Sequence, residues 1–157
     1  KGTMVSEFAK QSLEQVSILR SALEGVSANL AAKNITDEDF RDLQGLLGKV
    51  EALLENDDNI DQIESLNRQF HEGINRLSNN QYLCQLIENQ WAFSQGFRIG
   101  SLKTMAARQA SHTEHRAILK AVYSKDSDLA ERLMREHIRS SDKTALGHIS
   151  RPAAENH

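Results

Sequence analysis

The sequence has 157 residues, one cysteine, one proline and a formal net charge of −3. This length fits one domain with a substantial core. The charge provides no basic surface for nucleic acid, and Cys84 alone can form neither an intrachain disulfide nor a zinc-ribbon site. No run of about 18 apolar residues is present, which argues against a membrane span. The composition predicts a soluble, cytoplasmic chain that does not itself hold DNA.

Apolar residues recur at three- and four-residue steps through most of the chain, which predicts amphipathic helices. No stretch alternates apolar and polar residues as a strand does. The predicted helices span roughly residues 6–33, 37–54, 60–77, 81–100, 110–124 and 127–146. Residues 101–109 are either a loop or the frayed end of a helix. Because the connections are short, the fold class is all-α, an antiparallel bundle of about six helices.

Local signals add detail to the first two helices. The first helix is predicted to bury an apolar row of Val16, Leu19, Leu23, Val26 and Leu30. Thr36, with Asp39 three residues later, resembles a capping box at the start of the second helix. Gly45 and Gly48 inside that helix are candidates for close approach of a neighbouring helix.

Three histidines on three predicted helices are candidate metal ligands. Asn67 and His71 are four residues apart at the edge of one apolar stripe, and His115 and His137 lie on the apolar faces of later helices. Imidazole nitrogens are the commonest metal ligands, and helical bundles build metal sites in their cores. Three histidines and an oxygen donor suit zinc, nickel or another first-row divalent ion. Spacing alone leaves ordinary core histidines equally open, and His112, on nearly the same face as His115, competes for its role.

A second group of polar residues is suited to binding an anion. Arg20 borders the predicted inner face of the first helix, where it either forms a local pair with Glu24 or faces a ligand cavity. Gln90, Ser94 and Arg98 follow one another at four-residue steps along the fourth helix and are candidates to line the same pocket. For Arg98 alone, a surface position is the simpler interpretation.

The sequence carries no motif that would make these residues an enzyme. His71-Glu72 does not extend into a His-Glu-x-x-His helix, and no Glu-x-x-His pair, phosphate loop or nucleophile elbow is present. A small metal-dependent enzyme with a three-histidine site is the alternative, because such a metal could activate water. A metal-free helical interaction module is a third possibility.

An ordered series of motifs resembles the FCD effector-binding domain, the C-terminal half of FadR-subfamily GntR transcriptional regulators, and six helices are more similar to its VanR-type branch. The motifs are Ile18-Leu19-Arg20-x-x-Leu23-Glu24, Leu30-Ala31-Ala32, Thr36-x-Glu38-Asp39, Asn67-x-x-Phe70-His71, Asn79-x-x-Tyr82-Leu83, Glu114-His115-x-x-Ile118-Leu119-x-Ala121 and Asp126-x-x-x-Ala130-x-x-x-Met134-x-x-His137. The resemblance covers residues 5–146. Residues 1–4 look like a cloning remnant, and residues 147–157 are expected to be a disordered tail.

The resemblance implies a divalent metal held by Asn67, His71, His115 and His137, with Asn67 at a position where the family more often has Asp. It also implies a small carboxylate effector beside the metal, with Arg20 as its counter-charge and Gln90, Ser94 and Arg98 as further pocket residues. The domain would be a homodimer that controls operator binding through a winged helix-turn-helix, a part that this sequence does not include. The expected role is therefore regulatory and not enzymatic.

Overall fold

The computed structural model describes the backbone of residues 2–149 and the side chains of residues 7–148. Six α-helices and one short 3-10 helix account for nearly all of this part. Their bounds are α1 Gly2–Asn34, α2 Asp37–Glu51, η1 Asp57–Asn59, α3 Ile60–Leu77, α4 Gln81–Gly100, α5 Met105–Tyr123 and α6 Ser127–Ile149. Residues 2–149 contain no strand, and the prediction of an all-α bundle is confirmed.

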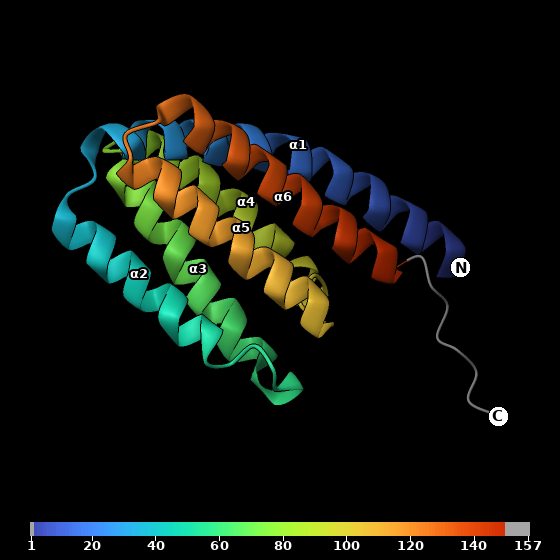
Figure 1. Cartoon of the computed structure of the whole chain (residues 1–157). Helices are drawn as coiled ribbons and strands as arrows, with labels where there is room; N and C mark the ends of the chain where they lie inside the picture. Colours follow the sequence, from blue (N-terminus) through green and yellow to red (C-terminus); the bar gives the residue numbers. More distant parts are fainter. Residues whose placement is uncertain (1, 150–157) are drawn as a thin grey trace.

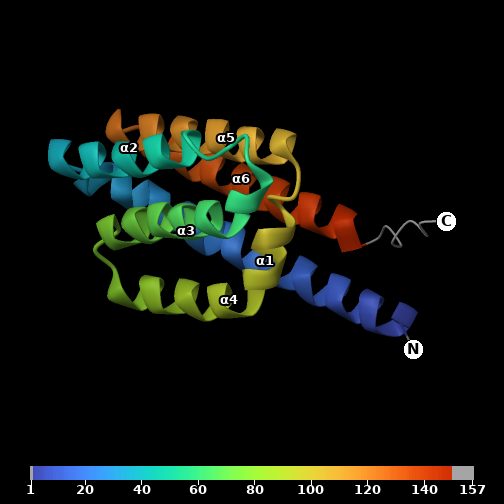
Figure 2. The same cartoon turned by 90° about the horizontal axis from the view of Figure 1, so that it is seen from below.

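The bundle is arranged around α1 and α6, which lie side by side (Figure 1). The hairpin of α2 and α3 covers one side, and α4 packs against α1, α3 and α6. Figure 2, seen from below, shows α4 alongside α3. Helix α5 lies between α2 and α6 and also contacts α1. Helices α1, α3, α5 and α6 therefore surround a common interior, in which a side chain from each can meet the others.

The buried face of α1 differs from the one that its apolar row predicts. Leu19 is 51% exposed and Val26 is 41% exposed, whereas Leu23 and Leu30 pack against α4. The fully buried side chains of α1 lie on another face and are mostly small or polar: Leu13, Ser21, Glu24, Ser27, Ala28, Ala31 and Ala32. Since α1 contacts four other helices, small side chains allow these neighbours to approach closely.

The predicted role of Gly45 and Gly48 in a close helix contact is wrong. A Cβ atom added at either position would meet nothing within 4 Å. In the contact of α2 with α3, the close approach is instead at Gly73 of α3, where an added Cβ would lie 2.6 Å from Cδ2 of Leu43 on α2. Glycine spacing within one helix cannot reveal this, because the contact depends on the neighbouring helix.

The helix ends follow local capping signals. The capping box of Thr36 and Asp39 is present, as predicted. Helix α5 begins earlier than expected, at Met105, because the Thr104 hydroxyl caps it by accepting from the Ala107 N–H. At its C-terminal end, α6 continues beyond residue 146 to Ile149, so residues 147–149 of the expected tail are helical. Residues 150–157, like Lys1, lie outside the described residues, and residues 2–4 belong to α1.

Among the residues that the structure describes, no helix is both long and apolar enough to cross a bilayer.

Candidate metal centre

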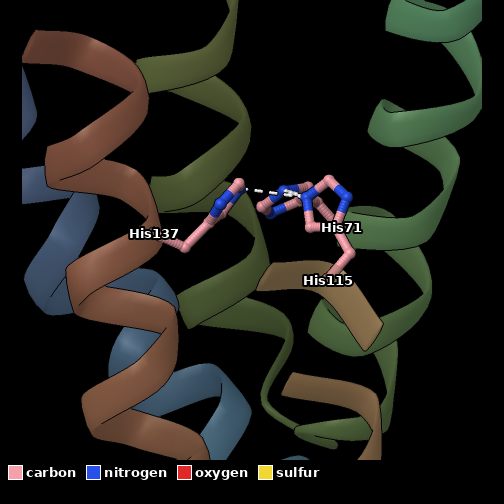
Figure 3. Close-up of side chains that lie close together, drawn as sticks. All are labelled: His71, His115 and His137. Carbon is pink, nitrogen blue, oxygen red and sulfur yellow. Dashed lines mark hydrogen bonds between the residues drawn. The ribbon is translucent and has the colours of Figure 1, made fainter. Parts of the chain in front are cut away.

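Three helices bring three imidazole rings together in the interior of the bundle. His71 comes from α3, His115 from α5 and His137 from α6, and their side chains point toward one another (Figure 3). Nε2 of His115 lies 3.0 Å from Nε2 of His71 and 2.9 Å from Nε2 of His137. All three rings are buried, so the cluster is shielded from bulk water.

Two carboxylates orient the outer rings of this cluster. Nδ1 of His71 lies 2.7 Å from Oε2 of Glu24, and Nδ1 of His137 lies 2.6 Å from Oε2 of Glu114. A carboxylate accepts a hydrogen bond, so each Nδ1 carries the proton and each Nε2 presents a lone pair to the centre. Carboxylates hold the ring orientation of metal-binding histidines in the same way.

The electrostatic setting favours the neutral imidazole in His71 and in His115. Burial lowers the pKa of His71 although the Glu24 carboxylate opposes it, and burial, followed by the neighbouring His137 and His71, holds the pKa of His115 well below 6.5. Burial alone would raise the pKa of Glu24, but His71 and Arg20 together lower that pKa to about 2. A metal cation binds to neutral imidazole nitrogens, and an ionised carboxylate nearby stabilises its positive charge.

Asn67 lies one turn from His71 and lines the same cavity. Its side-chain oxygen is buried and has no hydrogen-bond partner among the described residues. The cavity, whose volume is about 40 Å³, is also lined by the three histidines and by Arg20 and Arg98. With this oxygen, the lining of the cavity offers four donor atoms, one oxygen and three nitrogens.

Of the four predicted ligand-binding residues, the structure brings two to the cavity. Arg20 is buried and donates to Glu24 at 3.2 Å and to Asp142 at 3.4 Å, so it both forms the local pair and lines the cavity. Arg98 lines the cavity and donates to Glu64 and to the hydroxyl of Ser94, at 2.9 Å. Ser94 thus contacts the cavity only through Arg98.

Gln90 is half-buried and is not among the residues that line this cavity. His112, the competitor of His115, is buried elsewhere and is not part of the histidine cluster. The four-residue spacing of Gln90, Ser94 and Arg98 correctly places Arg98 at the cavity, but it could not show how far along α4 the cavity extends.

Sequence reasoning missed the role of Glu24. It accepts hydrogen bonds from Arg20, from His71 and, at 2.7 Å, from the indole N–H of Trp91, and it is completely buried. A signal was available, because Glu24 stands one turn after Arg20 and between small residues of α1. This signal was outweighed by the apolar row on another face of α1, which predicts a different buried face.

The geometry fits a metal ion. Nitrogen ligands about 2.1 Å from one ion, at angles between 90° and the tetrahedral value, lie about 3.0–3.4 Å apart, close to the separations of His115 from His71 and from His137. Without a cation, Nε2 of His115 carries at most one proton and can satisfy only one of the two facing lone pairs. The donor set of His71, His115, His137 and Asn67 is therefore suited to a first-row divalent ion.

Comparisons with known proteins agree with this architecture. The family model for the FCD domain matches residues 15–140. The HTH-type transcriptional regulator McbR of Escherichia coli strain K12 is 37% identical over 87 residues, which are 55% of this chain and 39% of McbR. The HTH-type transcriptional repressor GlaR of the same strain is 26% identical over 145 residues, which are 88% of this chain and 66% of GlaR. The chain thus spans less than two thirds of either relative.

Solved structures show the same fold. E. coli McbR/YncC superposes with a TM-score of 0.80 at 25% identity, covering 88% of this chain and 69% of that one. Streptococcus agalactiae GntR gives a TM-score of 0.67 at 25% identity, covering 83% of this chain and 58% of that one. These comparisons do not distinguish the VanR-type branch, which stays a prediction. The relatives are transcriptional regulators and not enzymes, and the chain belongs to the FCD domain family, the effector-binding domains of GntR-family regulators.

Proposed function

We propose that this domain senses a small organic acid beside a bound divalent metal and thereby controls operator binding by the regulator to which it belongs. In this proposal His71, His115, His137 and Asn67 hold the metal, and zinc or nickel is the expected ion. The acid completes the metal's coordination through a carboxylate. A coupling free energy of roughly 1–3 kcal/mol between the effector site and the DNA-binding part suffices for such control.

The observation that carries the proposal is the convergence of three Nε2 atoms from three helices in a cavity that Asn67, with its unpartnered oxygen, also lines. The carboxylates of Glu24 and Glu114 support it, since they fix the lone pairs toward a common point. An amide oxygen brings no charge, so Asn67 is expected to bind the ion more weakly than an aspartate would.

Arginines supply the counter-charge for the acid. Arg20, Arg68 and Arg98 line the cavity together with Glu64 and Asp142. Guanidinium groups favour carboxylates because they donate two parallel hydrogen bonds. A cavity of about 40 Å³ admits a metal ion and a water-sized ligand, so a larger acid must displace side chains at its edge. Arg68, whose side chain is 47% exposed and pairs with Glu72 at the surface, is the lining side chain best placed to move.

The active unit in this proposal is a cytoplasmic homodimer. Six of the eight exposed large apolar side chains of the described residues belong to α1 or α4: Phe8, Ile18, Leu19, Val26, Tyr82 and Phe93. Because Leu23 and Leu30 of α1 pack on α4, the two helices form one adjoining surface. An apolar surface of this kind marks a protein interface, and a second copy of this chain is the proposed partner.

Elemental analysis of the purified protein tests the metal site. Near-stoichiometric zinc or nickel is expected in the parent and in the control His148→Ala, whose histidine lies outside the cluster. The metal is expected to be lost in His71→Ala and in His137→Ala, since each removes one of three nitrogen ligands. Asn67→Asp should bind the ion about tenfold more tightly, because it adds a negative charge to the donor set.

A thermal-shift screen of small carboxylates then tests the effector. An acid that raises the melting temperature of the metal-loaded protein, and not of the metal-free protein, supports the proposal. Absence of metal from the parent after incubation with zinc and with nickel would refute the coordination by these residues.

A further inference from the structure

A second, larger concavity lies between α2 and α5 and shares no lining residue with the histidine cavity. Its volume is about 490 Å³, within the range of pockets that hold small organic molecules. Nothing in the proposed metal and acid site uses this groove. It is therefore a candidate for an independent binding site, provided that its walls offer specific contacts.

The buried polar side chain in the lining of this groove is His112, which is only 6% exposed. Neither ring nitrogen has a hydrogen-bond partner among the described residues, in contrast to the partnered rings of His71 and His137. A buried polar group without a partner is destabilising, and native proteins rarely keep one without a reason. Rotation about the Cβ–Cγ bond, a broad torsion in histidine, would turn a nitrogen toward a ligand in the groove.

The walls of the groove are apolar and partly aromatic. The rings of Phe40 and Tyr123 are stacked with their centres 4.0 Å apart, and Leu47 and Leu119 contribute aliphatic surface. Gly48 lines the groove where a side chain would otherwise stand, and a Cβ added there would meet nothing within 4 Å. The groove therefore has room for the apolar body of a ligand.

Two cations stand in line with His112. His112, Arg116 and Lys120 follow one another at four-residue steps of α5, which places them about 6 Å apart along the groove. Arg116 has one long pair with Glu51, at 3.7 Å, and both side chains are largely exposed. Lys120 forms no ion pair with any residue in the described part of the chain. An anionic group beside Arg116 and Lys120 would be attracted by the ammonium charge of Lys120, which no carboxylate of the described residues neutralises.

We propose that the groove between α2 and α5 binds a small amphipathic carboxylate. The carboxylate lies at Arg116 and Lys120, the apolar body packs against Leu47 and over Gly48, and a hydroxyl at the other end hydrogen-bonds with His112. Apolar walls with a few polar groups at set spacings are the usual composition of a small-molecule site. The proposal does not depend on a metal at the histidine cluster.

A suitable probe is 3-(4-hydroxyphenyl)propionate, compared with 3-phenylpropionate, which lacks the hydroxyl group. Binding is measured on the whole chain by NMR, with the histidine rings labelled so that His112 is observed separately from His71, His115 and His137. The first probe is expected to shift the His112 signals and to bind with a Kd of about 1 mM or below. The second is expected to bind about fivefold more weakly because it leaves His112 unpartnered.

Two glycines of α2 provide a matched pair of variants. Gly48→Leu fills the groove, whereas Gly45→Leu places the same side chain in open space outside the lining. Both replace a glycine inside a helix, so both are expected to fold at least as stably as the parent. Affinity for the hydroxylated probe should fall at least about tenfold in Gly48→Leu and stay unchanged in Gly45→Leu, and Lys120→Gln should reduce it about fivefold.

Several results would overturn the proposal. One is an equal affinity of the two glycine variants, and another is a probe that shifts the signals of the histidine cluster and leaves His112 unaffected. A third is dissociation of a dimer in Gly48→Leu alone, since the groove would then be covered by a second copy of the chain. Because metal content does not enter these measurements, failure of the metal site would leave them interpretable.

Discussion

At the scale of single residues, the interior of this domain depends on ionisable groups that are buried in fixed protonation states. Glu24 is the centre of this network, since it accepts hydrogen bonds from Arg20, His71 and Trp91 without any exposure to water. A buried carboxylate requires such partners, because an unpaired charge in a protein interior is strongly destabilising. The arrangement makes stability sensitive to pH.

The metal-free protein should lose stability in two steps as the pH falls. The pKa values of His71 and His115 are lowered by burial, so unfolding takes up protons below pH 6.5. Each proton taken up lowers the free energy of unfolding by about 1.4 kcal/mol per pH unit. The pKa of Glu24 is lowered from 4.5 to about 2. Its ionised form therefore stabilises the folded protein, and this stabilisation, about 3 kcal/mol, is lost as the pH falls from 4.5 to about 2.

Urea unfolding at a series of pH values measures this dependence. Asp142 opposes this loss of stability in part, because burial raises the pKa of its carboxyl group. The folded state therefore takes up this proton more readily than the unfolded state, and stability gains as the pH falls through that pKa. The variant His115→Leu should show a shallower slope between pH 6.5 and 5, because it lacks one titrating ring. A free energy of unfolding that does not change between pH 7 and 5 would contradict the neutral, buried state assigned to these histidines.

At the scale of helices, a glycine inside a helix matters for packing only where a neighbouring helix lies close to its Cα atom. Gly73 of α3 faces Leu43 of α2, and Leu43 is itself buried in the main core. Gly45 of α2 faces open space. The two glycines therefore have opposite roles, although both lie inside helices.

Replacing each glycine with alanine should separate these roles. Gly73→Ala is expected to lower the free energy of unfolding by about 1–3 kcal/mol, because its methyl group would overlap the Leu43 side chain. Gly45→Ala should raise it by up to about 1 kcal/mol through helix propensity. Equilibrium denaturation of the two variants decides the matter. A stabilised Gly73→Ala protein would mean that α2 and α3 can separate without cost.

At the scale of the whole molecule, the exposed apolar side chains of α1 and α4 are the feature that the isolated chain leaves unexplained. Leu19 and Val26 share a helix face with Leu23 and Leu30, which pack on α4. An apolar row that the fold does not bury is suited to a symmetric interface between two copies.

A charge placed in this row should weaken the dimer. Leu19→Asp is expected to raise the dissociation constant at least about a hundredfold, since an unpaired carboxylate would be buried in the interface. Met105→Asp is the control, because Met105 is an exposed apolar residue of α5 outside this surface. Sedimentation of the parent and both variants measures the change. A parent protein that stays monomeric at high concentration would exclude the proposed dimer.

The sequence alone determined the six helices, the capping box at the start of α2 and the candidate residues near the cavity. These features depend on contacts three or four residues apart, such as the Thr36–Asp39 capping box and the step from Asn67 to His71. The same periodicity indicated that His115 and His137 are on inward faces, and both are buried beside His71. Local spacing is sufficient for such predictions because it is a property of one helix.

Only the tertiary structure decided which faces are covered and which polar groups meet. The apolar row of α1 was the stronger local signal, yet the interior accepts Glu24 and small residues because four helices approach α1 closely. The same packing separates His112 from the histidine cluster, and it joins Glu24 to a ring 47 residues away. Periodicity marks a face, but the identity of the neighbour depends on how all the helices pack together.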